Sequence, residues 1–133
     1  MNNEWKYAVL KIYARGGIIA VQPRETRVLS LHDWHTNVGG FIETVARTKP
    51  LEMIGDGIDL RMLVDEDGIR KELPVNPIAS ELYARPDAMI VGDAVLCEQA
   101  MTSIGPDLVA MDIKKAYEIK ERLQSWVLLM HIF

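Results

Sequence analysis

The sequence predicts an α+β domain in which a mainly antiparallel sheet packs against a short glycine-started helix and a long C-terminal helix. Three patterns predict this class: extended runs near the start, a helical apolar stripe around residue 41, and a long amphipathic run toward the end. The chain has 133 residues, enough for one core without disulfides. No repeat or linker divides it, so residues 1–133 are expected to form a single domain.

The first elements predicted are antiparallel strands. Residues 7–13 are rich in β-branched and aromatic side chains, and residues 14–17 end in two glycines that favour a turn. Residues 18–22 would return as the second strand, closed by Pro23. Residues 26–31 offer a third extended segment.

A short helix is predicted next, over residues 38–46, with Thr36 or Asn37 as its N-cap. Its apolar positions follow helical spacing: Val38, Phe41, Ile42, Val45 and Ala46. Gly39 and Gly40 lie in its first turn, at a cost of about 2 kcal/mol relative to alanine. Some other feature of the fold should offset that cost.

The second half of the chain is expected to contain a hairpin, a short helix and a buried strand. Residues 58–64 and 69–73 would pair across the turn at 65–68. Asn76 before Pro77 predicts a capped helix over residues 77–84. The apolar residues 88–97 predict a central strand with a bulge or turn at Gly92 and Asp93.

A long amphipathic helix is predicted from Pro106 onward. Its apolar stripe is formed by Val109, Ile113, Ala116, Ile119, Leu123, Trp126 and Met130. Residues 126–133 are apolar on more than one face, so the sheet, a second copy or a partner should cover them. We expect self-association through Trp126 to Phe133 rather than a monomer.

Charge and composition exclude several classes of function. The 15 basic and 19 acidic residues give a formal charge of −4, which disfavours strong nucleic-acid binding. Cys97 is the single cysteine, so no internal disulfide can form and a reducing compartment is expected. The start lacks the pattern of a signal peptide, and the longest apolar run is too short to span a membrane. A cytoplasmic protein is therefore expected.

Four short segments, taken together, resemble a known family. They are residues 38–43 (VGGFIE), 65–68 (DEDG), 73–79 (LPVNPIA) and 90–94 (IVGDA). In this order they resemble a domain family of unknown function that is common in phages and bacterial mobile elements. The resemblance covers about residues 28–97. It implies a small accessory protein of the host-cell cytoplasm with no assigned reaction or catalytic residue, and by association an anti-defence role.

The glycine pair and Asp93 are the first candidate ligand contacts. Gly39 and Gly40 at a helix start would leave backbone N–H groups free for an anion, with Glu43 nearby. The alternative is that these glycines only allow close packing. Asp93 lies in an apolar strand, where it either caps backbone donors or recognises a ligand.

Other polar residues are open to two interpretations each. Trp34 either anchors a polar loop or stacks on a ligand base, and Asn76 caps a helix or contacts the ligand. His32 and His35 lack the further ligands that a metal site needs. Residues 65–68 form a turn rather than a calcium loop, and Cys97 is interpreted as a small buried residue without an adjacent base.

These residues favour a non-enzymatic protein without a cofactor or metal, which binds a small ligand or a host component. The candidate contacts are Gly39, Gly40, Glu43, Asp93, Trp34 and Asn76. A sharper version has the protein sequester a nucleotide-derived defence signal. The alternative is an inhibitor or adaptor that acts on a host protein through the apolar end or the acidic hairpin near Asp65. A metal-dependent enzyme built on His32 and His35 ranks last.

Overall fold

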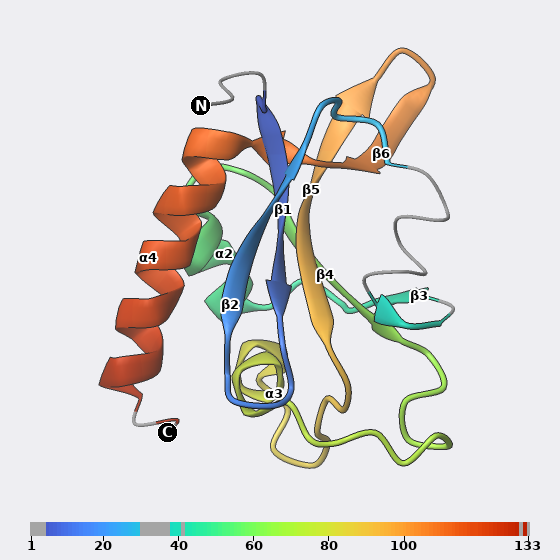
Figure 1. Ribbon diagram of the computed structural model, residues 1–133, viewed down its shortest axis with the longest axis vertical. Coiled ribbons are helices and arrows are strands. Elements are labelled where there is room, and N and C mark those ends of the chain that lie inside the picture. Colours follow the sequence, from blue (N-terminus) through green and yellow to red (C-terminus); the bar gives the residue numbers. More distant parts are fainter. Residues whose placement is uncertain (1–4, 30–37, 41, 131, 133) are drawn as a thin grey trace.

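One antiparallel sheet organises the part of the chain that the computed structural model describes, which is residues 5–29, 38–40, 42–130 and 132 (Figure 1). Its main path runs β2-β1-β5-β4-β3, with β6 paired to β5 and β7 paired to β1. The strands are β1 (Tyr7–Ile12), β2 (Ile19–Arg24), β3 (Ile42–Thr44), β4 (Leu60–Asp65), β5 (Ala94–Thr102), β6 (Gly105–Val109) and β7 (Met111–Asp112). The predicted fold class is confirmed.

The first hairpin forms as the sequence predicts. β1 and β2 pair from Tyr7 with Arg24 to Ile12 with Ile19. Gly16 and Gly17 both take positive φ in the turn, a conformation that glycine adopts without a steric penalty. The second strand continues through Pro23, which lies on the outer strand of the sheet, where a missing N–H is tolerated.

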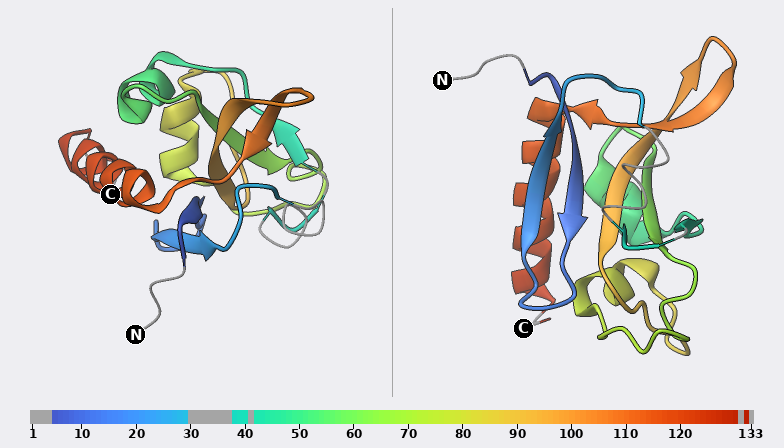
Figure 2. Two further views of the ribbon diagram at one scale, coloured as in Figure 1. Left: turned by 90° about the horizontal axis from the view of Figure 1, so that it is seen from above. Right: turned by 45° about the vertical axis from the view of Figure 1, so that its right-hand side comes forward.

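Three helices of the described residues pack on one face of the sheet (Figure 2): α2 (Lys49–Gly55), α3 (Pro77–Tyr83) and α4 (Ile113–Leu129). α2 and α3 begin in the same way, because Thr48 and Asn76 each cap a helix that carries proline in its first turn. The Asn76 cap and α3 confirm the sequence prediction. α2 was not predicted from the sequence.

Side chains on the two faces of the sheet belong to different apolar clusters. In β5, Ala94 and Leu96 face the helices, whereas Val95 and Cys97 face the other side. This alternation follows from the two-residue period of a strand. The cluster on the helix side is the larger, and it includes buried residues of α2, α3 and α4.

The helix predicted over residues 38–46 is wrong, because Ile42–Thr44 form β3 at the edge of the sheet. Val45 extends the pairing, since its N–H donates to Met62 O at 2.9 Å. Gly39 has φ +90°, which is incompatible with an α-helix. The apolar spacing was compatible with both structures, and pairing with β4 decided between them.

The predicted return strand at residues 69–73 is also wrong. Residues 66–72 form successive turns, closed by hydrogen bonds such as Lys71 N–H to Asp67 O at 3.0 Å. Ile69 is exposed, so it does not form the buried face that a strand in this segment would have. β4 instead pairs with β3 on one side and β5 on the other.

The last third differs from prediction in where its elements begin. β5 starts at Ala94, after Gly92 at φ +80°, and it is central, as predicted. The segment from Pro106 to Val109 belongs to β6, so the long helix begins at Ile113. The predicted stripe within α4 is confirmed, because Ala116, Ile119 and Leu123 are its buried residues.

Candidate functional site

A pocket of about 400 Å³ opens at the end of the sheet where the β1–β2 turn lies. This volume falls within the range of small-molecule sites. Five separate stretches of chain line it with both apolar and charged side chains: Tyr13, Arg15, Val38, Gly39, Asp65, Lys71, Leu73, Pro74, Gly92 and Asp93. Its residues therefore come together only through the fold.

The four segments that carry the family resemblance all contribute to this pocket. They supply Val38 with Gly39, then Asp65, then Leu73 with Pro74, and finally Gly92 with Asp93. The last two segments are tied by backbone bonds, Gly92 N–H to Pro74 O at 2.7 Å and Asn76 N–H to Ile90 O at 2.8 Å. Two predicted site residues, Gly39 and Asp93, thus line one cavity.

Asp93 fixes the turn between β1 and β2. Its Oδ1 accepts a hydrogen bond from Ala14 N–H at 2.9 Å, across 79 positions of sequence. Its Oδ2 lies 3.6 Å from Lys11 Nζ, which also sits 4.7 Å from the centre of the Tyr13 ring. Of the two predicted roles, Asp93 performs the capping of a backbone donor.

Gly40 lies close to an ion pair whose carboxylate is buried and whose ammonium group is partly exposed. Lys71 Nζ lies 2.7 Å from Asp65 Oδ2 and 3.4 Å from Gly39 O. A Cβ on Gly40 would lie 2.6 Å from that nitrogen and 2.7 Å from that oxygen. A close approach to the Asp65 and Lys71 side chains therefore explains Gly40, whereas a Cβ on Gly39 would meet nothing within 4 Å. The predicted packing of a helix on a strand is not what either glycine serves.

Asn76 lies behind the pocket and is fully buried. Its Nδ2 donates to Ile12 O and Gly92 O, each at 3.0 Å, and its Oδ1 accepts from Ala79 N–H at 3.1 Å. Both amide protons are thereby used within the fold. Asn76 supports the Gly92 wall of the pocket and does not line the cavity.

The remaining predicted contacts are not brought into the pocket. Glu43 is exposed and borders two smaller hollows beside Val64 and Ile90, on the helix side of the sheet. Its neighbour Ile42 packs with the opposite cluster. Trp34 lies outside the described residues, as do His32 and His35.

Sequence reasoning missed three polar side chains of the pocket: Tyr13, Arg15 and Lys71. Arg15 lies in the predicted turn, and Lys71 lies in the segment predicted to be a return strand. In the described part of the chain, the Arg15 side chain has no hydrogen-bond or ion-pair partner. A charged residue beside two turn glycines was the available indication, because such a turn can bring its side chain against a site.

Cys97 and the acidic turn have structural explanations. Cys97 is buried, and burial raises the pKa of its thiol well above the usual range. Its sequence interpretation as a small buried residue is confirmed. Asp65 is buried as well, so this part of the acidic segment is not available as an interface.

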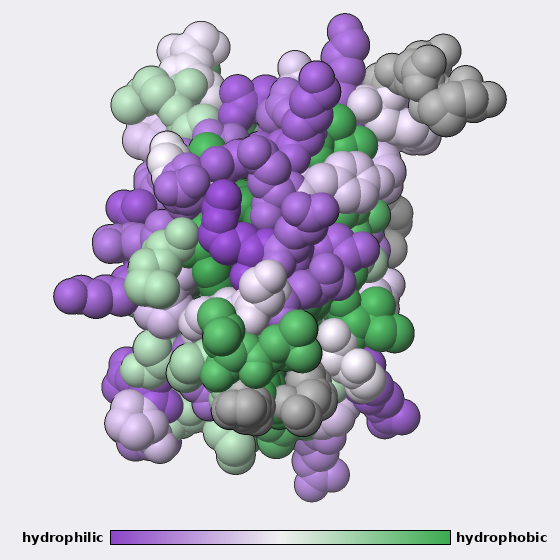
Figure 3. Space-filling view, turned by 90° about the vertical axis from the view of Figure 1, so that its left-hand side faces the viewer, coloured by the Kyte–Doolittle hydropathy of each residue, from purple (hydrophilic) through white to green (hydrophobic). Residues whose placement is uncertain are grey.

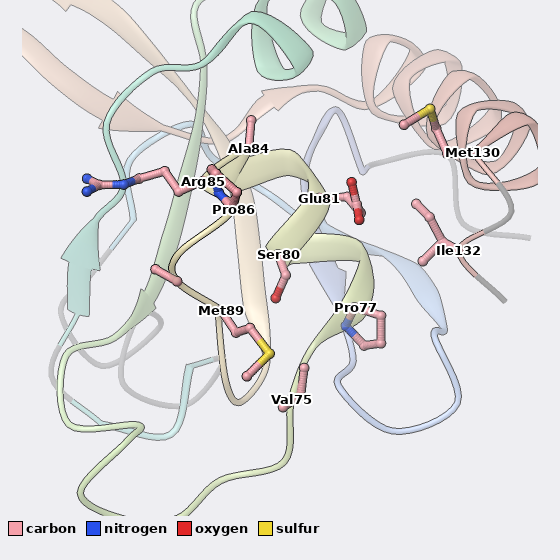
Figure 4. Close-up of a pocket in the computed structure, with 11 residues that line it drawn as sticks. Val75, Pro77, Ser80, Glu81, Ala84, Arg85, Pro86, Met89, Met130 and Ile132 are labelled. Carbon is pink, nitrogen blue, oxygen red and sulfur yellow. The ribbon is translucent and has the colours of Figure 1, made fainter.

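A second pocket, of about 600 Å³, lies between α3 and the end of α4. Figure 4 shows Val75 and Met89 on one side of α3 and Met130 and Ile132 on the other, with Glu81 between them. Apolar side chains gather at this end of the molecule, whereas the rest of the face is mainly polar (Figure 3). Trp126, Val127 and Ile132 pack on the larger core, and Leu128 and Leu129 are exposed.

No family model matches this chain, and no curated protein matches its sequence. One solved structure is similar, "Crystal structure of small RNA methyltransferase HEN1", with a TM-score of 0.58 and 14% sequence identity. The match covers 90% of this chain and 16% of that chain. It shows that this arrangement of strands and helices occurs elsewhere.

Two further features limit the kinds of site present in the described residues. None of their helices is long and apolar enough to cross a membrane. No group of three or more His, Cys, Asp or Glu side chains among them is placed to hold a metal ion.

Proposed function

We propose that this protein binds a small molecule in the pocket at the β1–β2 turn, as a non-enzymatic accessory protein of a phage or prophage. The supporting observation is that all four segments of the family resemblance line this one cavity. A single binding site would explain why four segments that are far apart in the sequence and distinct in composition occur together. The cavity also combines apolar and charged walls, as ligand sites do.

The contacts of the two pocket carboxylates, Asp65 and Asp93, favour ligand binding over catalysis. Asp65 pairs with Lys71 and accepts from Asp67 N–H, while Asp93 anchors Ala14 and faces Lys11. A general base must be free to take a proton from a substrate. Both carboxylates instead serve to hold turns in place.

The biological setting of the proposal rests on the resemblance. Phage accessory proteins act in the host cytoplasm, and sequestration of a nucleotide-derived defence signal would need only a cavity that holds the signal. That role predicts tight binding without turnover.

The direct test is to identify what the pocket retains. Purified protein is incubated in bacterial cell extract, washed and denatured, and released compounds are identified by mass spectrometry. Pro74→Trp places an indole at the exposed rim of the pocket, and Pro86→Trp is the matched control at an exposed proline outside it.

A stoichiometric compound retained by the wild type and Pro86→Trp, but lost from Pro74→Trp, supports the proposal. Equal retention by Pro74→Trp would place the compound elsewhere. Release of nothing above a denatured control would contradict small-molecule binding under these conditions and favour the second candidate.

The second candidate function is binding of a host protein through the end of α4. Leu128 and Leu129 are 76% and 78% exposed, next to the pocket that Met130 and Ile132 line. Adjacent exposed leucines beside a cavity are typical of a protein interface. A double change of Leu128 and Leu129 to glutamine should abolish partner capture with little loss of stability. Unchanged capture would exclude this surface.

A further inference from the structure

The charged side chains around the β1–β2 pocket form two ion pairs, and one arginine is left unpaired among the described residues. Lys71 neutralises Asp65 at 2.7 Å, and Lys11 lies 3.6 Å from Asp93. Arg15 lines the same cavity without a partner among the described residues. The charged side chains that line the cavity balance, with Arg15 and Lys71 against Asp65 and Asp93. Lys11, which does not line it, pairs with Asp93, so Arg15 is left as the unmatched cation among these described residues, in a chain of formal charge −4.

The position of Arg15 is fixed by the fold around its backbone. The turn that carries it is closed by Tyr13 N–H donating to Ile18 O at 2.9 Å. The residue before Arg15 donates its N–H to Asp93. A guanidinium on a turn held at both ends is well placed to bind an anion, because its planar N–H groups match carboxylate and phosphate oxygens.

We infer that the pocket binds a small molecule through an anionic group, a phosphate or a carboxylate, with Arg15 as its contact and Asp93 as the residue that positions the Arg15 turn. This inference rests on the proposed function and narrows its ligand. Lys71 lies on the same cavity and adds a second cation, which its pairing with Asp65 partly offsets.

Asp93 has a positioning role because its nearest described donor is the backbone of the turn. An anionic ligand would be repelled by this carboxylate, and Lys11 reduces that repulsion. The charge of Asp93 and its hydrogen bond therefore act in opposite directions on binding. Two substitutions can separate them.

Anion binding is measured by following backbone amide shifts in NMR titrations with inorganic phosphate, acetate and methylammonium at constant ionic strength. Single small fragments are expected to bind in the millimolar range. Phosphate or acetate should shift the amides of Ala14, Gly16 and Gly92, and methylammonium should not. The stronger of the two anions identifies the ligand group.

The variants compared are Arg15→Gln and the matched control Arg85→Gln, an exposed arginine 3.7 Å from Asp87 and outside this pocket. Arg15→Gln should weaken anion binding at least about tenfold, the usual scale for losing a charged hydrogen-bond partner, and Arg85→Gln should leave it unchanged. Equal binding by Arg15→Gln, or no shift with either anion, overturns the inference.

Asp93→Asn and Asp93→Ala then test the positioning role. Asparagine retains an oxygen for Ala14 N–H and removes the negative charge, so anion binding should strengthen about threefold. Alanine releases the turn, and binding should weaken. Weaker binding in Asp93→Asn, together with a methylammonium shift in the wild type, would show that Asp93 contacts a cationic ligand and overturn the assignment.

These outcomes are separable from those of the extract experiment. A compound that is lost from Pro74→Trp but carries no phosphate or carboxylate leaves the proposed function intact and overturns the anion inference. A compound retained equally by Pro74→Trp contradicts the proposed site, whatever the fragment titrations show.

Discussion

The two faces of the sheet differ in what covers them and in what their ends carry. On one face α2, α3 and α4 enclose the larger apolar cluster. On the other, the described cluster is small and includes Val9, Leu63 and Val95. The polar pocket lies at the end of this second face, where Lys11, Asp65 and Asp93 depart from the apolar pattern.

We therefore expect the helix-covered face to contribute most of the stability of the sheet, and the end of the other face to bind the ligand. Burial of apolar area against helices supplies most of the folding free energy. The face that no described helix covers accepts charged residues at its end, because paired charges and backbone donors satisfy them there. Function is then expected where the packing is thinner.

The largest expected effect compares one fully buried leucine from each face. Leu96→Ala, in the helix-covered cluster, should lower the free energy of unfolding by about 4 kcal/mol, and Leu63→Ala by about 2 kcal/mol. The helix-covered site is less able to collapse around a cavity. Urea unfolding followed by circular dichroism measures both, and equal losses would contradict the comparison.

The second-largest effect on stability is expected at Asn76, whose buried hydrogen bonds connect α3 with β1 and with the pocket wall at Gly92. Asn76→Ala removes the cap of α3 and leaves Ile12 O and Gly92 O without their buried donor, a loss of about 2–3 kcal/mol. Thr48→Ala is the control, since Thr48 caps α2 and bonds to Leu82 O, and it should cost about 1 kcal/mol. Thermal unfolding of both variants tests the difference.

The smallest effect concerns a surface ion pair next to β4. Arg61 donates to Asp59 at 2.8 and 3.1 Å, and this hydrogen bonding lowers the pKa of Asp59 below its usual value. A lowered folded-state pKa stabilises the protein above the unfolded pKa of about 4, and that gain is lost as pH falls through the folded value.

Asp59→Asn should therefore destabilise the protein at pH 7 by less than about 1 kcal/mol, because the side chains are partly exposed. The difference from wild type should shrink as pH falls below about 4, as measured by urea unfolding at several pH values.

Local patterns predicted several elements because short-range forces define them. The β1–β2 hairpin follows from its glycine turn, α3 from Asn76 and Pro77, and the buried stripe of α4 from its spacing. The helix around Gly39 failed because the same apolar spacing fits a short edge strand. Pairing between Ile42 and Asp65 involves residues 23 positions apart, which no local pattern contains.

The candidate site was predicted in part. Gly39 is predicted at a helix start, which is wrong, and Asp93 is predicted as a carboxylate in an apolar segment; both line the pocket. Asn76 was identified as a cap, and its buried bonds to Ile12 and Gly92 were beyond local inference. Arg15 is indicated in the sequence only by its position beside the two turn glycines.

Side-chain periodicity and one local cap were enough to predict the α+β class, the Asn76-capped helix α3, the buried stripe of α4 and the central position of β5. The meeting of five stretches of chain in one cavity depends on the three-dimensional fold. The same holds for the hydrogen bond by which Asp93 holds the Arg15 turn, and for the close contacts that a side chain on Gly40 would make with Asp65 and Lys71. Those properties depend on distances between segments, which are set by strand pairing and core packing across the whole chain.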